Sequence, residues 1–146
     1  MHPPSKRHVI GQQWFATDDQ SRVRLRVSEN PTDGSRWFPP LESLGTLTEL
    51  PAIEIGPSGV AYASTVVRVG PARFEPPYVL TYVDVDGVRI LAHSPGETPL
   101  RPGTPVELVL DRVGAEAPTA HPGHEPGPSI ELWSYTATPV TEGTTR

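Results

Sequence analysis

The stretch from Gly59 to Leu91 constrains the fold more than any other part of this sequence. Along Tyr78–Val85 the residues alternate between two faces, with Val79, Thr81, Val83 and Val85 on one and Tyr78, Leu80, Tyr82 and Asp84 on the other, which is the period of a β-strand. Asp86 and Gly87 follow, and this pair favours a tight hairpin turn because glycine tolerates a positive φ. A proline-rich loop comes before the hairpin. The stretch therefore predicts three successive strands, at 59–69, 78–85 and 88–93.

Two more strands are predicted at 106–110 and 130–138, on either side of a long flexible insertion at 114–128 that is rich in Pro, Gly and His. The chain of 146 residues has 19 prolines and 13 glycines. They lie mostly between apolar runs, as turn residues do, and they argue against a helical bundle. We therefore predict an all-β protein built on a five-stranded Greek-key barrel of the OB-fold type.

The N-terminal part is predicted to be a mixture of short elements. Residues 1–8 are polar and proline-rich, and we expect them to be disordered. Ile10, Trp14 and Phe15 could share one face of a short helix, although Gly11 disfavours it. A turn is expected at 30–34.

The segment Arg22–Val27 alternates strictly between arginine and an apolar residue, which predicts a half-exposed strand. Its arginines, Arg22, Arg24 and Arg26, would form either an ordinary solvated face or a basic strip for phosphate.

Three segments resemble a known protein family: G-V-A-Y-A-S-T-V-V-R at 59–68, F-E-P-P-Y-V at 74–79 and G-V-R-I-L-A at 87–92. That family joins an N-terminal rubredoxin-like zinc ribbon to a C-terminal OB-fold and serves acyl-CoA enzymes as an accessory subunit. The resemblance covers 59–110 well and 34–40 faintly. It implies an N-terminal extension with a ribbon at 1–58 and an OB-fold domain at 59–146.

The cysteines of the zinc ribbon are missing, since the chain contains none. Counting from the F-P-P segment at 38–40, the first cysteine pair of the family falls on Asn30 and Asp33, and the second pair falls on Leu44 and Leu47. Leucine cannot bind zinc, so we expect a degenerate, metal-free ribbon. Packing of apolar side chains would replace the metal, with Leu41, Leu44, Leu47 and Leu50 clustering against Trp37 and Phe38.

The loop between the first two barrel strands is the best candidate for a ligand site. Arg68 and Arg73 could meet phosphates, for which guanidinium groups are well suited. Phe74 and Tyr78 could stack on a flat ring, and Pro76 and Pro77 would hold the loop extended. With the resemblance, these groups suggest CoA or acyl-CoA shared with a partner. The alternative is that Phe74 and Tyr78 close the mouth of the barrel and the arginines are merely solvated.

The resemblance also implies a partner and a role. Relatives associate with thiolase-like enzymes, with lipid-transfer-protein-type aldolases of steroid metabolism and with MaoC-like hydratases. The chain would be a non-catalytic subunit of a hetero-oligomer that bridges subunits and helps to form a CoA site. Four large apolar residues are the candidates for the partner interface: Trp14, Phe15, Trp37 and Phe38.

Two other functions stay open. A free-standing OB-fold could bind nucleic acid through Phe74, Tyr62, Tyr78 and Tyr82, but the sequence pI is about 5.5 and the chain has a single lysine. A small independent hydratase could use His93 with a carboxylate as an acid–base pair.

Other chemistry finds little support in the sequence. His121 and His124 have an H-x-x-H spacing that could hold a metal, but a solvated loop explains them as well. No G-x-S-x-G motif occurs. No apolar run approaches the roughly 20 residues that span a bilayer, so we expect no membrane association and a cytoplasmic protein.

Overall fold

The computed structural model describes residues 6–41, 50–116, 123 and 129–140. These residues form ten β-strands and two short 3₁₀ turns, η1 (Gln12–Trp14) and η3 (Ala72–Phe74). Within these ranges no helix is long and apolar enough to cross a membrane.

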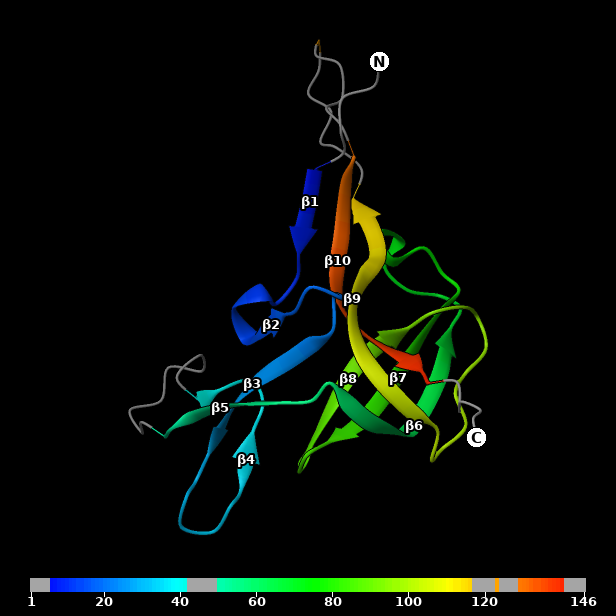
Figure 1. Ribbon diagram of the computed structural model, residues 1–146. Coiled ribbons are helices and arrows are strands. Elements are labelled where there is room, and N and C mark those ends of the chain that lie inside the picture. Colours follow the sequence, from blue (N-terminus) through cyan, green and yellow to red (C-terminus); the bar gives the residue numbers. More distant parts are fainter. Residues whose placement is uncertain (1–5, 42–49, 117–122, 124–128, 141–146) are drawn as a thin grey trace.

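Five strands close into a barrel (Figure 1). They are β6 (Ser58–Val67), β7 (Tyr78–Val85), β8 (Val88–Ser94), β9 (Pro105–Glu116) and β10 (Ile130–Pro139). Neighbours around the barrel run in the order β6-β7-β8-β10-β9 and back to β6. All pairs are antiparallel except β8 with β10. This connectivity confirms the predicted OB-fold.

The β7–β8 hairpin shows why the sequence folds in this way. Val79, Thr81, Val83 and Val85 are buried inside the barrel, and the residues between them face outward. At the predicted turn, Asp86 and Gly87 both have a positive φ, of 40° and 92°. That conformation matches the right-handed twist of the two strands.

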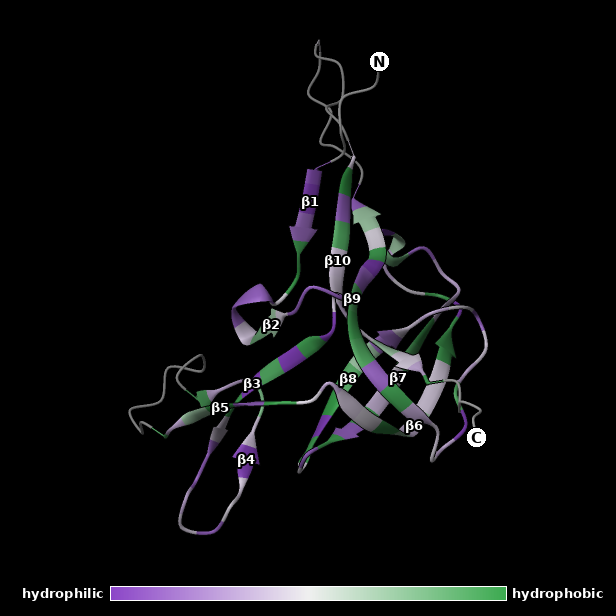
Figure 2. Ribbon diagram, in the orientation of Figure 1, coloured by the Kyte–Doolittle hydropathy of each residue, from purple (hydrophilic) through white to green (hydrophobic). Residues whose placement is uncertain are grey.

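A second sheet packs against the barrel. Its central strand is β3 (Val23–Glu29), which pairs with β2 (Phe15–Thr17), β4 (Arg36–Trp37) and β5 (Ala52–Ile55). Green and purple alternate along β3 in Figure 2, as predicted. Val23, Leu25 and Val27 are fully buried and belong to the same core cluster as the inward-facing residues of the barrel. Each such side chain contributes about 1.5–3 kcal/mol, so apolar burial joins the sheet to the barrel.

The predicted zinc positions are only partly described. Asn30 and Asp33 lie in the turn between β3 and β4, where their side chains accept hydrogen bonds from the backbone N–H groups of Thr32 and Ser35, both at 2.9 Å. Leu44 and Leu47 lie outside the described residues. Among the described residues no group of three or more His, Asp or Glu side chains could hold a metal ion.

The prediction for the N-terminus was wrong in two respects. Residues 6–8 are ordered in β1 (Lys6–Val9), which pairs with β10 in parallel. The short helix is replaced by the single turn η1, because Gly11 has a φ of +73° and a helix cannot pass through that conformation. Phe15 therefore lies at the start of β2 and does not belong to a helix.

The predicted strand at 106–110 is longer than expected. As β9 it extends to Glu116, because its residues pair with β10 as far as the Ile130–Glu116 pair. Residues 114–116, which were predicted to begin the insertion, therefore belong to β9. The predicted boundary between domains at 58/59 falls inside β6, after its first residue, and the core cluster contains residues from both sides of it.

Candidate functional site

The outward side of β6, β7 and β8, called the outer face below, carries the main candidate site. Strand register places its side chains in rows that cross the three strands. In the middle row Tyr82 lies between Ala63 and Leu91, and in the next row Leu80 lies between Thr65 and His93. Neighbouring side chains in such rows lie about 4.5–5.5 Å apart and form a continuous surface.

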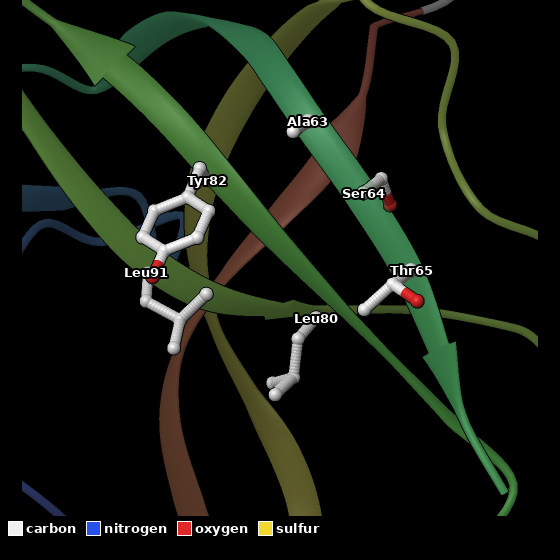
Figure 3. Close-up of a pocket in the computed structure, with 6 residues that line it drawn as sticks. All are labelled: Ala63, Ser64, Thr65, Leu80, Tyr82 and Leu91. Atoms are coloured by element: carbon white, nitrogen blue, oxygen red, sulfur yellow. The ribbon is translucent and has the colours of Figure 1, made fainter.

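The middle of the outer face is apolar and hollowed. Figure 3 shows the side chains of Tyr82, Leu91 and Leu80 to the left of the β6 residues that line the same hollow. With Ala63, Ser64 and Thr65 these residues line a hollow of about 380 Å³, called the Tyr82 hollow below. Tyr82 is 47% exposed and Leu91 is 45% exposed. Two large apolar side chains thus lie half in water next to a concave surface.

One end of the outer face is charged but internally paired. The Arg89 guanidinium donates two hydrogen bonds to the Asp84 carboxylate, at 2.7 and 3.1 Å. Its carbon atom also lies 3.4 Å from the centre of the Tyr62 ring. The hydrogen bond from Arg89 lowers the pKa of Asp84. Tyr62, which is 51% exposed, thus packs against this ion pair through a cation–π contact.

The other end of the outer face is a ring cluster of Phe74, Tyr78 and His93. The ring centres of Phe74 and Tyr78 are 5.6 Å apart, and the His93 ring lies 4.8 Å from Phe74 and 5.3 Å from Tyr78. The Arg73 guanidinium carbon lies 4.8 Å from the centre of the Phe74 ring. Burial lowers the pKa of His93, which favours the neutral imidazole.

Strand β9 holds the η3 turn against the barrel. Arg112 on β9 donates a hydrogen bond to the Glu75 carboxylate at 3.0 Å. Gly114 packs directly under the turn, where a Cβ atom would lie 2.0 Å from the Arg73 carbonyl oxygen. Only glycine allows this approach, so Gly114 helps to set the position of Arg73 and Phe74.

The residues predicted to bind CoA lie together around η3 and the start of β7. Arg68, Arg73 and Pro77 are exposed, and Pro76 is partly buried. Phe74 and Tyr78 pack into the ring cluster, with Arg73 already against the Phe74 ring. No finding tests CoA binding, so this site stays a prediction.

The four residues predicted to form a partner interface do not form one exposed patch. Phe15 is buried in the core, and its ring centre lies 5.7 Å from that of Tyr135. Phe38 packs edge to face against Trp14 and Tyr135, at 6.0 Å in each case. Of the four side chains, only that of Trp37 is exposed, with 37% of its surface in contact with solvent.

The three arginines on and just before β3 make contacts within the chain. Arg22 pairs with Asp18 at 2.8 Å, and Arg24 donates to the Gly56 carbonyl at 2.9 Å. Arg26 donates to the Gln13 carbonyl at 3.2 Å. These contacts match the solvated-face interpretation better than a phosphate strip. His121 and His124 lie outside the described residues.

The sequence analysis did not predict that Tyr82 and Leu91 lie side by side on the outer face, although the sequence contains a signal for this pairing. The Asp86–Gly87 turn pairs Val85 with Val88, and counting outward from that pair brings Tyr82 opposite Leu91. Alternation along both strands then puts this pair outside the barrel.

A comparison with known protein families agrees with this fold. The family model of "ChsH2, C-terminal OB-fold domain" matches residues 52–111. No curated protein matches the chain. Among solved structures, a similar chain comes from an "Ltp2-ChsH2(DUF35) aldolase"; it is 22% identical, with a TM-score of 0.49, over 84% of this chain and 91% of that chain. The matched segment runs from β5 into β9, and it is similar to ChsH2-type C-terminal OB-fold domains.

Proposed function

We propose that the chain is a non-catalytic accessory subunit of an acyl-CoA-processing complex. A thiolase-like enzyme, a lipid-transfer-protein-type aldolase or a MaoC-like hydratase would carry out the reaction. Two things support this role: the family match of residues 52–111 to the OB-fold domain of ChsH2, and the resemblance of 59–110 to acyl-CoA accessory proteins. The solved aldolase structure described above is named for ChsH2 together with Ltp2.

The observation that carries the proposal is the apolar middle of the outer face. Tyr62, Tyr82 and Leu91 are each about half exposed and lie on neighbouring strands beside the Tyr82 hollow. Tyrosine and arginine are enriched where protein interfaces are most strongly bound, and here Arg89 packs against the ring of Tyr62. In our proposal a partner subunit buries this face and inserts an apolar side chain into the hollow.

The proposal includes a shared CoA site at the η3 end of the outer face. Arg68 and Arg73 are exposed and would bind phosphate oxygens of CoA. Phe74 and Tyr78 would support the turn, since they are packed with His93. Pro76 and Pro77 would restrict the loop before β7. The partner would supply the rest of the site and the catalytic residues.

The test is reconstitution with a candidate partner of the named classes from the same host. The wild-type chain should form a stable complex by size-exclusion chromatography with light scattering. Tyr82→Ser should weaken this complex at least tenfold while the fold is retained by circular dichroism. Val140→Ser is the matched control, because Val140 is equally exposed, at 46%, but lies outside the outer face. Equal affinities of the two variants would refute the interface.

CoA binding is tested separately by titration calorimetry on the reconstituted complex. Arg73→Ala should lower the affinity for CoA about tenfold, since a charge-assisted hydrogen bond contributes about 1.5–3 kcal/mol. Arg101→Ala, in an exposed loop away from η3, should leave it unchanged. An intact complex whose CoA affinity does not respond to Arg73→Ala would refute the shared site but not the accessory role.

A further inference from the structure

The barrel has an opening between β8 and β10. The two strands pair only at His93 and Thr136, so the sheet separates on either side of that pair. A second hollow, of about 280 Å³, lies at this opening and is called the His93 hollow below. Ile10 borders it from the segment after β1, and Phe74 borders it from η3.

The lining of the His93 hollow is mostly apolar. Leu80, Leu91, Ala92 and Val113 contribute aliphatic side chains from three strands of the barrel. Leu80 and Leu91 also line the Tyr82 hollow, so these two residues separate the hollows. A small concave space with apolar walls and few polar groups is the usual form of a site for a small molecule.

Three polar side chains line the hollow, and two of them have no hydrogen-bond partner in the described part of the chain. Ser134 donates its hydroxyl hydrogen bond to the Ile10 carbonyl at 3.2 Å. The His93 imidazole contacts the rings of Phe74 and Tyr78 but makes no hydrogen bond to a described residue. The Tyr135 hydroxyl also makes no hydrogen bond to a described residue.

The lining is also uncharged at neutral pH. Among the described residues, no Asp, Glu, Lys or Arg lines the hollow. Burial lowers the pKa of His93 and raises the pKa of Tyr135 to about 12, so both groups stay neutral. An ionised ligand would lose its hydration without gaining an opposite charge, which is strongly unfavourable.

We propose that the His93 hollow binds a small, uncharged, mainly apolar molecule with one hydroxyl or carbonyl group, which hydrogen-bonds to the His93 ring. The volume suits a ligand of about the size of a fused pair of rings and lies just below the usual range of about 300–1,000 Å³ for small-molecule sites. This site does not depend on the accessory role, since all of its lining comes from this chain.

The test uses two probes of similar shape, neutral 2-naphthol and anionic 2-naphthoate, titrated at pH 7.5 into the ¹⁵N-labelled full chain. The proposal expects 2-naphthol to shift the amide signals of Ala92, His93, Ser134 and Tyr135 in a saturable manner. It expects 2-naphthoate to bind at least tenfold more weakly. Absence of saturable shifts with 2-naphthol, equal binding of both probes, or shifts confined to the Tyr82 hollow would overturn it.

Variants then identify the polar contact. His93→Phe keeps a ring in the cluster but removes both nitrogens, and should weaken 2-naphthol binding about five- to tenfold. Tyr82→Phe, in the neighbouring hollow, should leave the affinity unchanged. Val113→Phe fills the hollow and should abolish binding; it also keeps the test decisive if His93→Phe does not fold. Undiminished binding in a folded His93→Phe or Val113→Phe protein would overturn the proposal.

Discussion

Replacing Gly114 by alanine tests how the η3 turn is held in place. The new Cβ atom would lie 2.0 Å from the Arg73 carbonyl oxygen and 3.0 Å from the Phe74 Cα. A comfortable carbon–oxygen contact is about 3.3 Å, so the turn must move by roughly 1.3 Å. Such overpacking costs about 1–3 kcal/mol.

The higher strand propensity of alanine offsets only a small part of this cost. Alanine in a strand is favoured over glycine by about 0.5–1 kcal/mol, because glycine loses more backbone freedom on folding. The displaced turn also weakens the exposed Arg112–Glu75 pair, which contributes about 0.2–1 kcal/mol. We therefore expect a net loss of about 1–2 kcal/mol for Gly114→Ala. For a chain of this size that corresponds to a fall in Tm of roughly 2–8 °C.

Differential scanning calorimetry measures the fall in Tm, and NMR of the aromatic rings reports movement of Phe74 and Tyr78. Glu75→Gln is the control, because it removes the ion pair but adds no atoms under the turn. It should lower the stability by less than about 1 kcal/mol and leave the ring signals in place. A Gly114→Ala protein that is more stable than the wild type, as strand propensity alone would give, would refute the close-packing argument.

Three further predictions concern buried or half-buried side chains. The Thr81 hydroxyl forms hydrogen bonds with the Ser64 and Ser94 hydroxyls, at 2.9 and 2.8 Å, and Thr81→Val removes both. Urea unfolding should show a free energy of unfolding lower by about 1–3 kcal/mol. Leu25→Ala should cost about 2–5 kcal/mol, yet calorimetry should still show one transition, since the sheet and barrel share a core; two transitions would contradict this. The lowered pKa of His93 gives stability that is complete above about pH 6.5 and is lost as the pH falls through its folded-state pKa, so His93→Gln should flatten the loss of stability below about pH 6.5.

Much of the barrel could be predicted because its signals are local. Alternation in 78–85 and the Asp86–Gly87 turn depend on neighbours in the sequence, and the structure has both as expected. The position of β1 depends on a distant partner instead, since Lys6–Val9 pairs with residues 130–133. A polar, proline-rich segment carries no sign of such a pairing, so disorder was the natural expectation.

The candidate site was predicted in part for the same reason. Residues 68–78 are consecutive in the sequence, and in the structure they lie close together around η3 and the start of β7. Gly114 and His93, which contact η3, come from other strands. Nothing near Gly114 in the sequence indicates that its missing side chain matters. Only the pairing of β9 with β10 brings it under the turn.

One turn specifies both the core and the outer face of the barrel. The Asp86–Gly87 turn fixes Tyr82 opposite Leu91 outside and Thr81 opposite Ala92 inside. A slip of one residue would exchange the two faces of β8, bury Leu91 and expose Ala92. The core therefore selects strongly for this register, and the outer rows are fixed with it. Within that register the outward residues are not core residues, so their chemistry can change while the barrel is kept. The outer face is for this reason the part of the chain where a partner's requirements can be met at the least cost to folding.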